Sequence, residues 1–262
     1  MPVARHPATL LLGGLIGAAW LSLYMWDQSP YARYLDHGRW TDLGFASSLC
    51  RAVPGGDWLL PGALYASGWV LMTAAMMLPS VVPLLRRFER LAAGRADRAG
   101  LLGLLVTGYL LAWVGFGAVA HLFDAVLHAA AGHSAWLAAN AWAASAGTLA
   151  VAGLFQFSKL KYRCADRCRT PLGFIIQHWR GRAPRREALR LGLHHGLFCV
   201  ACCWALMLLM FVIGAGNLGW MLALGAVMAL EKNAAWGRSL SKPLGAGLLA
   251  WAGVLVAANV QP

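Results

Sequence analysis

Long runs of apolar residues, separated by polar connections, dominate the chain. The runs lack the strict apolar–polar alternation of half-buried strands, and about 20 residues of helix are needed to cross a bilayer. The pattern therefore predicts an all-α, polytopic membrane protein with about seven transmembrane helices. The predicted spans are 8–26, 62–85, 101–123, 135–157, 196–214, 217–230 and 243–260. Because the sixth span is short, six full spans with one re-entrant segment is the competing interpretation.

Composition supports this class. Hydrophobic residues make up 60% of the chain and charged residues 12%, with a mean hydropathy of +0.59, whereas a soluble domain carries about 25% charged residues. The net charge of +12 does not indicate nucleic acid binding, because the basic residues lie in the connections between apolar runs and not on one soluble face. We therefore expect the lipid bilayer as a partner and no nucleic acid.

The distribution of Lys and Arg predicts the orientation. The N-terminus and the connections 86–100, 158–195 and 231–242 hold 19 basic residues, while the connection 27–61 holds three. With seven spans, all the basic-rich connections fall on one side, which should be the cytoplasm. We therefore expect the N-terminus in the cytoplasm and the C-terminus outside. Asp27 to Pro30 follow the first run without a cleavage site, so this run is interpreted as a retained helix and not as a signal peptide.

The chain is interpreted as one transmembrane domain, 1–262. The cytoplasmic basic connection 158–195 is expected to be its largest irregular part. Its apolar residues 172–176 and Trp179 are flanked by Arg, which suits a segment in the lipid headgroup region, although a simple basic loop fits as well.

The fifth predicted helix carries the clearest chemical signal. At 100° per residue, six side chains fall within an arc of roughly 140°, and they include one imidazole, three thiols and two thioethers. They are His195, Cys199, Cys202, Cys203, Met207 and Met210, with His194 beside them. The first four span about two turns and can share one ion, whereas the whole set extends over about 22 Å. Soft sulfur ligands with imidazole favour copper, with zinc as the alternative. Packing of Cys and Met in an apolar core is the competing explanation.

Other candidates are weaker. Met76 and Met77 lie in the second helix, where a packing seam is the favoured explanation, although beside the cysteine helix they could supply further soft ligands. Glu231 closes the sixth helix and is either a ligand or an ion-pair partner. Further candidates lie in two more groups, namely Cys164, Cys168 and His178 in the basic connection, and His121, Asp124 and His128 on one face of the third helix. The last three suit a divalent ion or a polar helix end that faces water.

The sequence resembles a bacterial family of predicted metal-binding integral membrane proteins of unknown function. The resemblance covers roughly residues 60–255 and is carried by the stretches 76–80, 152–156, 168–174, 191–199, 202–207 and 231–232. It implies a multi-pass protein of the bacterial inner membrane, with a metal site built from those positions. Cys164 and the His121, Asp124 and His128 face depart from the family pattern.

Three functions follow. The first is membrane-embedded binding or handling of a soft metal, copper before zinc, at the cytoplasmic side. The second is a non-catalytic accessory or assembly subunit, with a membrane-protein partner or a homo-oligomer, in which Cys, Met and Trp pack helices. The third, an oxidoreductase, ranks last because no acid–base pair or substrate pocket is recognisable, so an enzyme is not the expectation.

Overall fold

The computed structural model describes residues 7–29, 59–213 and 217–260, and every secondary-structure element in these ranges is a helix. The helices are α1 Pro7–Asp27, α3 Leu59–Leu91, α4 Arg98–His133, α5 Ala135–Ala139, α6 Ala141–Phe155, α7 Lys159–Arg169, α8 Pro171–His178, α9 Pro184–Leu208, α10 Met210–Ile213, α11 Leu218–Asn233 and α12 Gly237–Asn259. The predicted all-α class is confirmed. Most of the connection 27–61 lies outside the described residues.

Four helical stretches in the described residues are long and apolar enough to cross a membrane. They are Ala66–Leu91, Arg98–His133, Pro184–Val212 and Gly237–Asn259. Each overlaps one of the predicted spans. The shorter α6 and α11 lie at the fourth and sixth predicted spans, and α1 coincides with the first. The number of seven spans and their orientation remain predictions.

The prediction of an irregular stretch at 158–195 is wrong, because this stretch forms α7, α8 and the start of α9. The sequence of this stretch nevertheless contains signals for helix starts. The Ser158 side chain accepts a hydrogen bond from the Lys161 amide and caps α7, while Pro171 and Pro184 occupy the first positions of α8 and α9. Capping hydroxyls and prolines at these positions favour helix starts. As a result α9 begins 12 residues before the predicted span 196–214.

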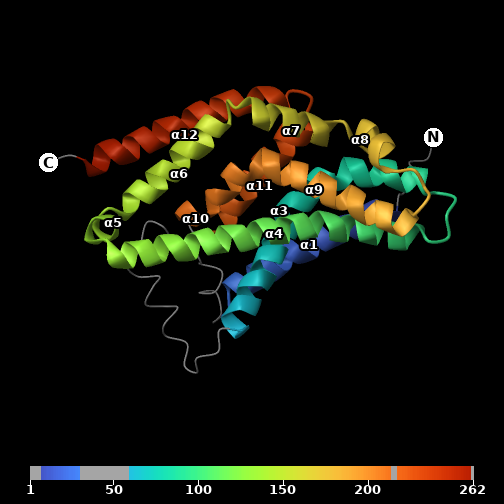
Figure 1. Ribbon diagram of the computed structural model, residues 1–262, viewed down its shortest axis with the longest axis horizontal. Coiled ribbons are helices and arrows are strands. Elements are labelled where there is room, and N and C mark those ends of the chain that lie inside the picture. Colours follow the sequence, from blue (N-terminus) through green and yellow to red (C-terminus); the bar gives the residue numbers. More distant parts are fainter. Residues whose placement is uncertain (1–6, 30–58, 214–216, 261–262) are drawn as a thin grey trace.

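Close contact between α4 and α9 fixes the position of the cysteine helix. A Cβ atom on Gly192 would collide with the backbone of Leu105, and one on Gly196 would lie 2.8 Å from the Tyr109 carbonyl oxygen. Small residues let helix backbones approach in this way. Figure 1 shows α9 running along α4. The contact places Tyr109 of α4 beside the cysteines of α9.

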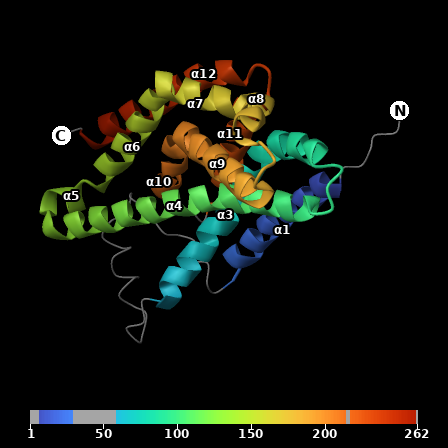
Figure 2. The same cartoon turned by 45° about the vertical axis from the view of Figure 1, so that its right-hand side comes forward.

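The remaining helices enclose α9. In Figures 1 and 2, α9 and α11 lie at the centre, with α4 on one side and the layer of α6, α7 and α12 on the other. α3 packs against α1, α4 and α11. The buried core therefore lies where α3, α4, α7, α9 and α11 meet, and the three cysteines of α9 belong to it.

Candidate metal centre

Four free thiols lie together in the protein core. Cys199, Cys202 and Cys203 of α9 are each at most 2% exposed, and Cys168 of α7 is also buried. The Sγ atoms of Cys202 and Cys203 are 3.5 Å apart, and the Cys202 thiol interacts with that of Cys168. The shared helical face predicted for the cysteines of α9 is present, and α7 adds a thiol from another helix.

Cys199 has three polar neighbours from three other helices. Lys232 Nζ of α11 donates to Cys199 Sγ at 2.7 Å. The Tyr109 hydroxyl of α4 lies 3.0 Å from the same sulfur, and the Ser80 hydroxyl of α3 lies 3.8 Å away. Both hydroxyls also donate to the carbonyl oxygen of Met77. Cys199 therefore lies at the point where α3, α4, α9 and α11 meet.

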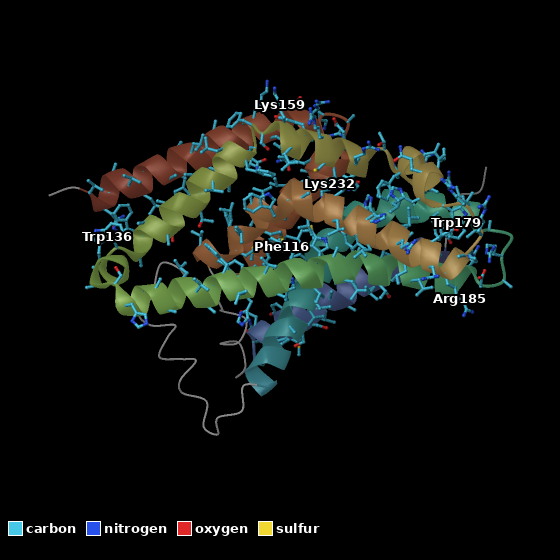
Figure 3. All side chains as sticks on the ribbon, viewed as in Figure 1. Phe116, Trp136, Lys159, Trp179, Arg185 and Lys232 are labelled. Carbon is cyan, nitrogen blue, oxygen red and sulfur yellow. The ribbon has the colours of Figure 1, made fainter. Side chains whose placement is uncertain are left out.

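Lys232 is a buried cation that faces the sulfur cluster. It lies near the centre of the molecule in Figure 3, and 6% of its surface is exposed. A buried ammonium group requires an electron-rich partner. Cys199 Sγ supplies that partner here, so the cluster carries a fixed positive charge beside its thiols.

The adjacent Glu231 does not face the thiols. Its carboxylate accepts from Lys161 Nζ at 2.7 and 2.9 Å and from the Ser241 hydroxyl at 2.7 Å. The Lys161 and Glu231 side chains are 3% and 6% exposed, and Lys161 also donates to Gln156. Glu231 is thus the ion-pair partner considered for it, and the cation is Lys161.

A small cavity adjoins the thiols. It measures about 10 Å³ and is lined by residues that include Cys202, Cys203, Lys232, Glu231 and Tyr162. That volume holds about one water-sized particle. Cys202 and Cys203 therefore border a small space that packed side chains do not fill.

His195 lies one turn before Cys199 and is 1% exposed. Its ring lies between Tyr109 and Phe174, with centroid distances of 6.1 and 5.4 Å. Its Nδ1 atom is buried and has no hydrogen-bond partner in the part of the chain that the structure describes. Buried ring nitrogens are normally paired, so this nitrogen is available to a ligand.

Not every candidate joins this group. His194 contacts His178 with ring centroids 5.0 Å apart, while the His178 ring stacks on Phe174. Cys164 lies one turn before Cys168 on α7, and burial together with the Cys168 thiol raises its pKa. Within residues 7–29, 59–213 and 217–260, no three His, Cys, Asp or Glu side chains are arranged to hold one ion.

The family model described as PpoB2, a copper chaperone, matches residues 66–255, which is well over half of the chain. The chain belongs to this copper chaperone family. No curated protein and no solved structure matches it significantly.

The PpoB2 match covers nearly the same range as the resemblance, 60–255, and it supports the metal-binding part of that resemblance with a copper-related family. It includes α4, α7, α9 and α11, and therefore every thiol described above, together with Lys232. The first helix, α1, lies outside it.

The polar face predicted on the third helix lies apart from the thiols of this copper chaperone family member. His121 is exposed and Asp124 is buried, whereas the His128 side chain lies outside the described residues. His121 comes 12 residues after Tyr109 on α4, which corresponds to about 18 Å along the helix. The structure therefore does not bring this face to the cysteines.

Sequence reasoning missed three neighbours of Cys199, namely Lys232, Tyr109 and Ser80. One signal was present for Lys232, because it ends an apolar helix within the last stretch of the family resemblance. Ser80 likewise lies in the stretch 76–80 of that resemblance, whereas Tyr109 carries no such signal. Their role depends on which turns of α3 and α4 face α9, and this is a property of tertiary packing.

Proposed function

We propose that the protein is a membrane-embedded copper chaperone that holds Cu(I) as cargo on the thiolates of α9. Cys202 and Cys203 would bind the ion, with Cys199 and Cys168 as exchanging neighbours. The observation that carries the proposal is the cluster of four buried free thiols within the region matched by the copper chaperone family. Soft thiolates favour Cu(I) over hard cations.

Charge supports a monovalent ion. Two thiolates and one Cu(I) leave a net charge of −1, and the Lys232 ammonium at the same cluster balances it. Glu231 and Lys161 neutralise each other and contribute no further charge. A buried site is favourable when its charges are compensated in this way.

His195 would be an additional ligand. Its unpaired Nδ1 is one helical turn from Cys199, so a modest side-chain movement would bring imidazole and thiolate to one ion. Thiolate retains the metal strongly, whereas a neutral imidazole allows exchange. A chaperone requires both retention and release, and this donor set suits that task.

The proposed setting is the bacterial inner membrane, with seven spans and the thiols near the cytoplasmic side. The basic connections support this orientation. The cytoplasm keeps thiols reduced, which suits the five free cysteines among the described residues. A membrane protein would receive the copper.

The test compares metal content and Cu(I) affinity of detergent-purified wild type, Cys202→Ser/Cys203→Ser and Cys164→Ser proteins. Cys164→Ser is the matched control, because it removes a buried thiol that is outside the proposed ligands. We expect near-stoichiometric copper in the wild type and the control, and its loss in the double variant at an unchanged elution volume. Equal copper in all three proteins would refute the site.

The accessory-subunit function makes the opposite prediction. A protein whose cysteines only pack helices would contain no stoichiometric metal after growth with added copper and zinc. It would then copurify with its partner whether or not the cysteines are present.

A further inference from the structure

Methionine is concentrated in one part of the core. Seven of the nine methionines are buried, each at most 3% exposed. They are Met72, Met76, Met77, Met207, Met210, Met221 and Met228. All seven lie on α3, α9, α10 and α11, whereas α4, α6 and α12 contain none. The extensive α4–α9 interface uses Leu, Ala and Gly instead, so dense packing in this protein does not by itself require methionine.

On α11 the methionines share a face with Lys232. Positions 221, 225, 228 and 232 fall within about 60° at 100° per residue. Gly225 lies between Met221 and Met228, and a Cβ on it would be 3.5 Å from the Met76 side chain of α3. The methionine face of α11 therefore packs on the methionine face of α3, and it ends at the cation beside Cys199.

The other two helices show the same arrangement. On α3, positions 72, 76 and 80 share a face, and Ser80 approaches Cys199. On α9 and α10, positions 199, 203, 207 and 210 fall within about 80°. Three rows of sulfur-bearing side chains thus start near Cys199 and continue in the same direction.

The rows on α3 and on α9–α10 extend over the same distance along the helix axes. Ser80 meets Cys199 at one end, and Trp69 meets Phe211 at the other with ring centroids 6.2 Å apart. Eleven residues of α3 and twelve of α9–α10 separate these contacts, which is about 17–18 Å on each side. Met76 then lies level with Cys203, and Met72 lies level with the region of Met207. The methionines form a column that leads away from the thiols.

We propose that this column is a second Cu(I) site, made of thioethers, through which Cu(I) reaches or leaves the thiol cluster. Its members are Met72, Met76, Met207, Met210, Met221 and Met228. The inference rests on the proposed copper function. Thioethers are soft neutral ligands that accept Cu(I) and carry no charge that would need compensation in an apolar core. Their binding is therefore weaker than that of thiolates, which suits transit.

Selenium tests this site directly. The full chain is produced with selenomethionine, loaded with Cu(I) under reductant in detergent, and studied by X-ray absorption at the selenium and copper edges. We expect a copper neighbour at the selenium edge of the wild type. It should be lost in Met76→Leu/Met207→Leu/Met228→Leu, since Leu nearly preserves the volume of Met. It should persist in Met25→Leu, which changes an exposed methionine of α1.

A second measurement follows transfer of bound copper to a chromogenic Cu(I) chelator. We expect the triple Met→Leu variant to keep the copper on its thiols but to release it several-fold more slowly than wild type or Met25→Leu. One outcome would overturn the thioether site and leave the thiol site standing. In it, the copper edge shows copper bound to sulfur, the selenium edge shows no copper neighbour, and the rate of copper release is unchanged in the triple variant. No bound copper in any sample would overturn both proposals.

Discussion

Replacing Lys232 by Leu tests the role of the buried cation most sharply, because Leu removes the charge and adds no ligand for copper. Lys232 Nζ lies 2.7 Å from Cys199 Sγ, and two unit charges at this distance interact by about 6 kcal/mol at an effective dielectric constant of about 20. The two thiolates proposed to hold Cu(I), Cys202 and Cys203, lie about one helical turn beyond Cys199, so their shared net charge of −1 is roughly twice as far from the ammonium group. About half of the interaction, ~3 kcal/mol, is therefore lost in the variant, which weakens Cu(I) binding about 100-fold.

The assay is competition with a chromogenic Cu(I) chelator at one pH and with excess reductant. Lys159→Leu is the control, because Lys159 is an exposed cation at the start of α7 (Figure 3) and its loss should leave the affinity unchanged. Lys232→Arg retains the charge and should recover much of the affinity. Unchanged or tighter binding by a folded Lys232→Leu protein would refute the reasoning, because Lys232 would then compete with copper for Cys199.

Three further experiments test the helix packing near the site, the buried ion pair and the membrane topology. Gly196→Ala forces a Cβ into the backbone of α4 and should lower the stability by about 1–3 kcal/mol, which is measured as a lower melting temperature in detergent. Gly253→Ala is the control, because its Cβ meets nothing within 4 Å and its melting temperature should be unchanged. Glu231→Gln leaves Lys161 buried without its anion and should lower the stability by about 3–5 kcal/mol. Adding Lys161→Met to this variant should restore part of the stability in the same melting assay. In intact cells, a cysteine introduced as Arg95→Cys should react only with membrane-permeant reagents, and a C-terminal epitope should be accessible from outside. The reverse pattern would contradict the predicted orientation, and finding both sites on the same side would contradict seven spans.

The helical class was predictable because it depends on local signals. Apolar runs of about 20 residues indicate membrane helices without any knowledge of packing. The prediction of an irregular stretch at 158–195 was wrong because the many Arg residues of this stretch suggest a loop, whereas its helix-start signals indicate helices. Ser158, Pro171 and Pro184 stand at the starts of helices in the structure, and this information was available in the sequence.

The site was predictable only within one helix. The helical repeat placed His195, Cys199, Cys202 and Cys203 on one face, and all four are buried in the structure. The partners on other helices were not predictable, because their positions depend on how α3, α4 and α11 approach α9. Gly192 and Gly196 allow that approach for α4, but a glycine pair in a sequence does not say which neighbour it admits.

The neighbouring residues Glu231 and Lys232 show why charge must be assigned in three dimensions. In the sequence they cancel, so the end of α11 looks neutral. On the helix they are 100° apart, and each therefore faces a different set of neighbours. Glu231 is paired with Lys161 of α7 and Ser241 of α12, and Lys232 with Cys199 of α9. Because Lys161 already neutralises Glu231, the positive charge of Lys232 is left for the thiols. A net-neutral pair in the sequence thus places one uncompensated cation beside the sulfur cluster, and that cation is what a Cu(I)–dithiolate unit of charge −1 requires.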